Sequence, residues 1–509
     1  MAPRLTAGLA FCLCCAAAQA ETTAPLSAID WLSNSIAQDA VPQEGAVAGP
    51  SASVPVEVRV LPLDKAVTDS AGLIDAAKLN LPQDIWGRSS AGDLTNALNR
   101  VELDADAPAS ISKFLRDLLQ ARLDPPIDAA VNDRFFFARV DRLLEKGHLD
   151  LARDLMDAAM IDDPQVFRRQ FDIALLTGNE TEACRQVEST PDLSPTYPAR
   201  IFCLMRLGQF DVAALTLGNA ETLGILPEAD DALLRHFLDP ELFEGEPLPA
   251  PPRFPTPLQF RLYEAIGERI STEGLPLPFA FADMSMDVGW KARLTAAERL
   301  AANGVIPFTR LLEVYSERGP SASGGVWERI RAVTRFAEAV ERGDGAELES
   351  KLPAAWAAAR QAGYTAAFAA WLQPHLSLLS AGRASHAAFE ISLLAGDATA
   401  ASRFANASVA DQFLLSIAED RAGTALAGDA FGRAVLRGLA AVNAGGTYEA
   451  LISDDRRGEA LLRALDQLAD GATGNPETTA QSLAALRKIG LHDLARQIAI
   501  EVILKEGEA

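Results

Sequence analysis

The sequence predicts an all-α fold, an α-α solenoid of stacked helical hairpins in two segments, with a small irregular N-terminal module that holds one short strand. Three observations predict this class. From about residue 94 onward, apolar residues recur at the spacing of amphipathic helices. A glycine followed five residues later by an alanine recurs in the same region. Alternation with period 2, the signal of a strand, is convincing only at residues 54–60.

Residues 1–20 are expected to be a secretory signal peptide. Arg4 is their only charge, an apolar run extends from Leu5 to Ala18, and a small-x-small site ends at Ala20. We expect cleavage between Ala20 and Glu21, and therefore a periplasmic or secreted chain. The alternatives are an uncleaved anchor, although a span needs ~20 apolar residues, or a lipid attached to one of the three signal cysteines.

Residues 21–93 are expected to form the irregular N-terminal module. An amphipathic stretch at residues 26–36 has helical spacing, and residues 38–53 have the composition of a flexible linker. The strand at 54–60 contains Pro55, which restricts it to the edge of a sheet.

Residues 94–238 are expected to form the first helical-repeat segment. The glycine-to-alanine offset occurs here three times, with glycines 31 and 30 residues apart: Gly147 with Ala152, Gly178 with Ala183, and Gly208 with Ala213. A glycine supplies the left-handed residue that ends the first helix of a hairpin, and a small alanine lets the second helix approach it closely. Since one hairpin cannot bury its apolar face alone, successive hairpins should stack.

These units resemble tetratricopeptide-like repeats, in which a glycine closes the first helix and an alanine lies early in the second. The tetratricopeptide period is 34 residues and includes an early Trp and Tyr and a closing Pro, which are not cleanly placed here. The resemblance implies stacked α-hairpins. The N-terminal region, including LPQDIWGRS at 81–89, is also similar to uncharacterised secreted alphaproteobacterial proteins, a family with no assigned chemistry.

Residues 239–257 contain seven prolines, so they are expected to be an extended linker; the alternative is a proline-rich ligand for an aromatic groove. Helical patterning then resumes over 258–509, the second repeat segment. The five-residue offset returns at three further turn glycines, Gly382, Gly396 and Gly490. The first two of these are 14 residues apart, which predicts one helix shared between two turns.

The mature chain has two cysteines, Cys184 and Cys203, which are expected to form one disulfide. The segment between them contains three prolines and predicts a loop, so the two flanking helices should be antiparallel neighbours. Each cysteine lies five residues from the loop, about 7.5 Å along its helix, so the two should face each other. The alternative is two separate buried thiols.

No catalytic, cofactor-binding or metal-binding residue is predicted. The five histidines share no helical face and are expected at helix ends or on the surface. Glu349 and Ser350 resemble the start of the E-S-x-x-x-P motif of periplasmic lytic transglycosylases, but Pro353 comes one position early and the downstream segment is missing. We expect Glu349 to be an ordinary helix residue and Pro353 to begin the next helix.

The chain of 509 residues carries 69 acidic and 46 basic residues, a net charge of -23. This charge disfavours nucleic acid and anionic membrane surfaces as partners. The leading hypothesis is a periplasmic interaction scaffold or adaptor for an unidentified envelope protein or peptide, without a cofactor and without a transmembrane span. The alternative is a cell-envelope hydrolase or lyase acting on glycan or peptide, which needs two carboxylates about 5–9.5 Å apart in a deep pocket.

Overall fold

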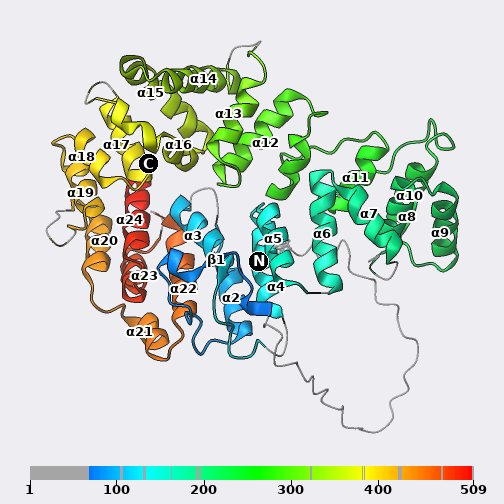
Figure 1. Cartoon of the computed structure of the whole chain (residues 1–509), viewed down its shortest axis with the longest axis horizontal. Coiled ribbons are helices and arrows are strands. Elements are labelled where there is room, and N and C mark those ends of the chain that lie inside the picture. Colours follow the sequence, from blue (N-terminus) through cyan, green and yellow to red (C-terminus); the bar gives the residue numbers. More distant parts are fainter. Residues whose placement is uncertain are drawn as a thin grey trace, which may run out of the picture.

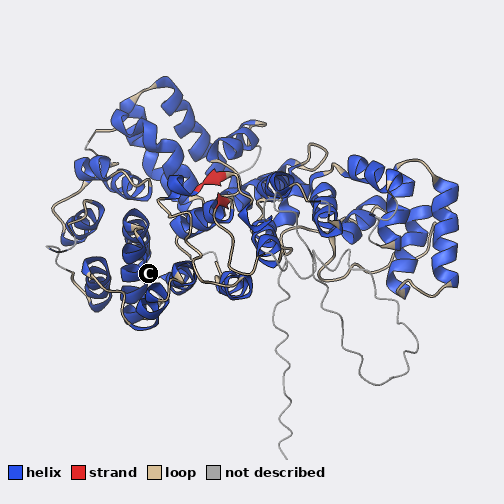
Figure 2. Cartoon of the chain, turned by 60° about the horizontal axis from the view of Figure 1, so that its bottom comes forward, coloured by secondary structure: helices blue, strands red, loops and turns tan. Residues whose placement is uncertain are grey.

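The computed structural model describes residues 68–506, apart from 104–106, 130–132, 162, 191–192, 194–195, 321–323, 381, 383, 422, 424–426 and 472–473. The predicted all-α class is confirmed, because the regular secondary structure of the described residues is helical apart from two strands of two residues each (Figures 1 and 2). The signal peptide with its Ala20–Glu21 cleavage site, the amphipathic stretch at 26–36 and the strand at 54–60 lie outside the described residues.

The elements up to residue 265 are η1 (Thr68–Ser70), β1 (Ile74–Asp75), η2 (Ala76–Leu79), α2 (Ala91–Arg100), α3 (Ala109–Leu119), β2 (Ala121–Arg122), α4 (Arg134–Glu145), α5 (Leu149–Ala159), α6 (Pro164–Thr177), α7 (Glu180–Ser189), α8 (Tyr197–Arg206), α9 (Phe210–Thr222), α10 (Glu228–Leu238) and α11 (Pro257–Ala265). The elements after it are η4 (Leu277–Met284), α12 (Trp290–Ala302), α13 (Phe308–Ser316), α14 (Val326–Arg342), α15 (Gly345–Ala362), α16 (Thr365–Leu372), η5 (Gln373–Leu378), α17 (Ser385–Leu394), α18 (Ala398–Phe404), α19 (Val409–Ala418), α20 (Ala430–Ala440), α21 (Gly446–Ser453), α22 (Arg457–Ala469), α23 (Pro476–Ile489) and α24 (His492–Glu506).

The N-terminal region holds the two strands, which pair in parallel with Ile74 opposite Ala121. The buried guanidinium of Arg139, on α4, fastens this small sheet to the helices. It donates to the backbone carbonyl oxygens of Asp69, Ala71, Leu119 and Ala121 at 2.9–3.0 Å. One arginine therefore satisfies four carbonyl groups, which belong to η1, the residue after it, the end of α3 and β2.

Two large hydrophobic clusters divide the helices into parts that we call the body and the arm. The body comprises the elements up to α5 together with η4 and everything after it. The arm comprises α6 to α11 and projects to the right in Figure 1. Within the body, α2 packs against α22 and α3 against α24, so the N-terminal helices lie beside the C-terminal ones (Figure 1, blue and red).

The junction between the two ends of the chain is closely packed. The Ser110 backbone N–H donates to the Glu501 carboxylate at 3.0 Å, and the Arg88 N–H donates to the Asp455 carbonyl oxygen at 2.8 Å. Gly458 lies directly on the indole ring of Trp86, where an added Cβ would come within 2.3 Å of a ring carbon. The solenoid is thus closed by contacts between residues that are far apart in sequence.

Helix α6 joins the arm to the body because its two faces are buried in different cores. Val166, Ile173 and Leu176 lie in the cluster of the body, whereas Phe167 and Phe171 lie in that of the arm. The proline-rich stretch contains no helix from residue 239 to 256, and its last proline, Pro257, begins α11, which returns to pack against α6 and α10. The packing therefore places α11 in the arm, while the sequence pattern grouped it with the second repeat segment.

Five of the six turn glycines lie between consecutive helices with φ between 72° and 105°: Gly147, Gly178, Gly208, Gly396 and Gly490. The alanine five residues after each of them is buried. Gly382 differs, because it ends no helix and lies three residues before α17 begins. An added Cβ there would lie 3.0 Å from a carboxylate oxygen of Glu349, so this glycine accommodates a close approach of that side chain.

Pro353 is a further difference from the expectation. It lies inside α15 and does not begin a new helix. The buried residues Leu348, Leu352, Ala355 and Trp356 continue across it on one face, so packing against α14 outweighs the hydrogen bond that proline removes.

Candidate functional site

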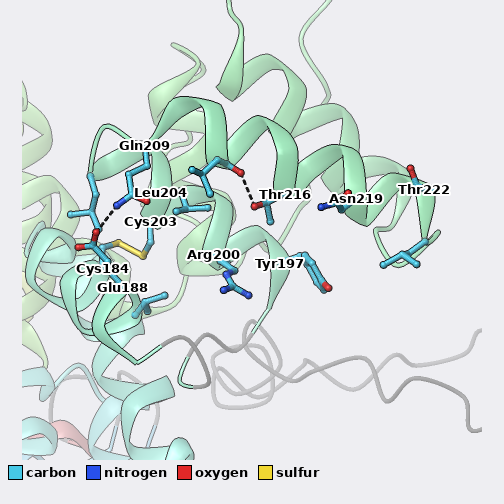
Figure 3. A pocket seen from close by; sticks show the side chains of 14 residues that line it. Cys184, Glu188, Tyr197, Arg200, Cys203, Leu204, Gln209, Thr216, Asn219 and Thr222 are labelled. Atoms are coloured by element: carbon cyan, nitrogen blue, oxygen red, sulfur yellow. Dashed lines mark hydrogen bonds between the residues drawn. A yellow bond between two sulfur atoms is a disulfide. The ribbon is translucent and has the colours of Figure 1, made fainter.

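The candidate site is a groove of about 670 Å³ on the arm, formed by α7, α8 and α9 (Figure 3). Helix α8 lies in the middle and contributes Tyr197, Arg200, Leu204 and Leu207, which follow one another at helical spacing along one face. Since α8 has ten residues, the groove runs for about 15 Å, the length of three helical turns.

The predicted disulfide between Cys184 on α7 and Cys203 on α8 is present and lines the groove (Figure 3). The two Cα atoms are 4.8 Å apart, within the range that a disulfide needs, and both side chains are buried. Thr196 caps α8, since its hydroxyl oxygen accepts a hydrogen bond from the Ala199 N–H. This cap fixes where α8 begins and therefore how far along the helix Cys203 lies. Disulfides of this kind are typical of oxidising compartments.

Helix α9 forms one wall of the groove and is apolar on more than one face. Ala213, Leu217 and Ala220 face the arm core. The α9 side of the groove is apolar at its two ends and polar between them, and it consists of Val212, Thr216, Asn219, Thr222 and Leu223. Leu223, and Leu215 on the outer side of the helix, are each 66% exposed. An apolar helix is normally buried on every side, so α9 has apolar surface without a partner among the described residues.

Exposed apolar side chains are concentrated in the part of the arm that contains this groove. Eight of the fifteen large apolar side chains that are exposed in the described chain lie between residues 197 and 254. Single exposed apolar residues are ordinary, but such a concentration marks an interaction surface.

The described lining of the groove contains one acidic and one basic side chain. Glu188 is the only acidic residue among the described residues that line it, and its carboxylate accepts a hydrogen bond from the Gln209 side chain. Arg200 is the only basic one; its guanidinium is exposed and contacts no other polar group of the described residues. Two carboxylates at glycosidase spacing are not found among the described lining residues.

Glu349 lies far from this groove, on α15. Its carboxylate accepts from the backbone N–H and the hydroxyl of Ser380, and these hydrogen bonds lower the pKa of Glu349. A general acid needs a raised pKa, so the side chain serves here to hold the segment after η5.

Two histidines are less exposed than the sequence suggested. His236 is buried on α10, where Nδ1 contacts the Ala232 carbonyl oxygen at 2.8 Å and the ring stacks on Phe243. His148 precedes α5 and is half-buried, because α3 and the end of α12 lie beside this turn. Helical periodicity cannot reveal such covering, since it comes from segments distant in sequence.

Comparison of the chain with protein-family models, with curated proteins and with solved structures found no match. In the described ranges, no group of three or more His, Cys, Asp or Glu side chains could hold a metal ion. The same residues include no helix that is long and apolar enough to cross a membrane. The sequence pattern indicated the disulfide but not the groove; its only local signal is the apolar character of α9 on several faces.

Proposed function

We propose that the protein is an exported cell-envelope scaffold, built from tetratricopeptide-like hairpins, that binds a segment of a partner protein in the groove between α7, α8 and α9. The partner segment is an amphipathic helix of about three turns, with apolar side chains toward α9 and one carboxylate toward Arg200. The observation that carries the proposal is the pair of exposed apolar side chains, Val212 and Leu223, at the two ends of the α9 side of the groove.

Charge supports the choice of partner. In a chain with a net charge of -23, Arg200 is an exposed cation, and Glu188, which Gln209 engages, is the only acidic residue among the described residues that line the groove with it. A carboxylate on the partner would pair with Arg200, whereas a basic segment would be repelled by this arginine. The exposed side chains of Val212 and Leu223 would supply the affinity, and the ion pair with Arg200 would set the register.

The disulfide supports a rigid site. It joins the two helices at the base of the groove, so less conformational entropy is lost when a partner binds. It also fits an oxidising compartment, where the proposed signal peptide would direct the chain.

The test is photo-crosslinking in cells from position 212, which is exposed and lines the groove, with the benzophenone amino acid p-benzoylphenylalanine in the full chain. A cross-linked species is expected, and Arg200→Glu or Leu223→Glu should remove it. Leu242→Glu is the matched control, because Leu242 is 70% exposed but lies outside the groove. Equal cross-linking in Leu223→Glu and in the unsubstituted chain would overturn the assignment of the groove.

A further inference from the structure

A second cavity, in the body, has a basic lining. It has a volume of about 30 Å³ and lies between α3, the turn from α4 to α5, and the end of α12. Its polar lining consists of Ser112, Arg116, Arg142, Lys146, His148 and Asn303, and leucines complete it. None of the described residues that line it is acidic, although the protein as a whole is strongly so.

Arg142 is the central group of this cavity. Its side chain is only 5% exposed, and Nη1 is paired with Glu145 at 2.6 Å. The other two nitrogens, Nε and Nη2, are buried without a hydrogen-bond partner. These two nitrogens form one edge of the guanidinium, with parallel N–H groups. A buried charged donor without a partner is costly, so an empty edge calls for a ligand.

Other arginines in the chain show what this edge binds. Arg169, Arg329 and Arg456 each donate from Nε to one oxygen of a carboxylate group and from Nη2 to the other. Their partners are Asp141, Glu298 and Glu459. Arg142 lines the cavity, and the described chain supplies no carboxylate to the same edge of its guanidinium.

The neighbouring groups add to the case for an anion. Arg116, which pairs with Asp117 at 2.7 Å, lies in the wall beside His148. Burial and the charge of Arg116 lower the pKa of His148 to about 4, so its imidazole is neutral at pH 7 and can donate one hydrogen bond. Asn303 is exposed at the end of α12, so the cavity reaches the surface there.

We propose that this cavity is a binding site for one carboxylate group, held in bidentate fashion by Nε and Nη2 of Arg142. A volume of about 30 Å³ corresponds to about two water positions, which matches the two oxygens of a carboxylate better than the four of a phosphate. The carboxylate belongs either to a small organic acid or to the C-terminus of a peptide; the experiment separates these sources.

The test follows the histidine resonances of the full mature chain by NMR at pH 7, during titration with acetate at constant ionic strength. The chain has only five histidines, and His148→Gln assigns the relevant one. We expect a saturable change at His148 in the millimolar range, with the other four unchanged. No change at His148, or the same change at all five, would refute the site.

Two variants test the geometry. Arg142→Lys keeps the charge but removes the fork, and it should weaken acetate binding at least about tenfold. Ser112→Asp, at a half-buried position of α3 in the cavity lining, adds a carboxylate of the chain itself and should abolish the response to acetate. This variant keeps the proposal testable if Arg142→Lys does not fold. Ser402→Asp, on the exposed surface of α18, should respond like the unsubstituted chain. An undiminished response in Ser112→Asp would contradict the proposal.

Two further ligands separate the sources. N-acetylglycine and its amide differ only in the carboxylate. Binding of N-acetylglycine more tightly than acetate supports a peptide C-terminus, and binding of acetate alone supports a small acid. If the amide bound as well as N-acetylglycine, carboxylate recognition would be wrong.

Discussion

The body and the arm are both made of helical hairpins, yet their cores are held together in different ways. In the body, residues from the two ends of the chain share one apolar cluster, and the Ser110–Glu501 hydrogen bond spans 391 residues. In the arm, the cluster is formed by residues 167–263, and the Cys184–Cys203 disulfide joins two neighbouring helices.

The difference shows what an open array of hairpins lacks. A solenoid repeat contacts only its neighbours, so terminal repeats lose part of their burial. The body avoids this loss by packing its first helices on its last ones. The arm has an outer end at α9, where apolar side chains stay exposed and a covalent bond stabilises the stack. The arm is therefore the part with surface left for a partner.

The largest effect is expected where the two ends of the chain meet. Trp86 is 3% exposed, lies on Gly458 and contacts the Phe135 ring edge-to-face at 5.1 Å. Trp86→Ala should lower the free energy of unfolding of the body by about 3–5 kcal/mol and leave the arm unchanged. Calorimetry of the oxidised protein measures both. Trp327→Ala, at a half-buried position, should lower the unfolding free energy of the body by less. An equal loss in the two variants would show that the contact between the two ends of the chain stabilises the body no more than other contacts do.

The next effect concerns the arm. Cys184→Ser opens a 19-residue link and should lower the unfolding free energy of the arm by about 3 kcal/mol under oxidising conditions. The body transition should stay where it is. With a reductant present, the variant and the unsubstituted protein should differ little. If both transitions moved together, the arm and the body would be one cooperative unit.

The third prediction concerns the pH dependence of stability, to which His148 and Asp69 in the body contribute with opposite sign. Since the pKa of His148 is lowered from 6.5 to about 4, the unfolded chain takes up this proton first, and acidification destabilises the fold. His148→Gln should remove about 1.4 kcal/mol of the stability lost between pH 7.5 and 5.5. Urea unfolding at the two pH values checks this.

Asp69 provides the control of opposite sign. Burial raises the pKa of Asp69 to about 6, so the folded state holds its proton more tightly, and acidification from pH 6 toward 4 stabilises the fold. Asp69→Asn should therefore increase the net loss of stability on acidification. The same direction of change in both variants would contradict these assignments.

The smallest effect is expected at a turn of the arm. Gly208 has a φ of 76°, and an added Cβ would meet nothing within 4 Å. Gly208→Ala should thus cost only the backbone strain, about 1 kcal/mol of the unfolding free energy of the arm. Gly274→Ala is the matched control, with equal space and no positive φ, and should be neutral. Chemical denaturation of both variants measures the difference.

The local elements of the fold could be predicted from the sequence because their causes are local. A glycine such as Gly178 ends a helix by its own φ, and the prolines between Cys184 and Cys203 predict from the sequence that two separate helices carry the two cysteines. Gly382 shows the limit: it has the same offset to an alanine, but its position is determined by the carboxylate of Glu349 on another helix.

Features that depend on distant contacts could not be predicted. Nothing near Trp86 indicates that Gly458 will cover it, and nothing in residues 257–265 indicates that α11 will turn back onto α6. Both candidate sites have the same difficulty. In the sequence, Arg200 and Arg142 look like ordinary helix arginines. Only the folded chain shows that no described carboxylate pairs with Arg200 or with the Nε–Nη2 edge of Arg142.

The closure of the body also fixes an order of events during synthesis. Ser110 leaves the ribosome well before Glu501, its hydrogen-bond partner 391 residues later. At about 5–20 residues per second, this interval lasts on the order of 20–80 s. Throughout it, the surface of α2 and α3 that will meet α22 and α24 has no partner. The newly made N-terminal third of the chain therefore keeps part of its helix-packing surface uncovered until the last helix is made.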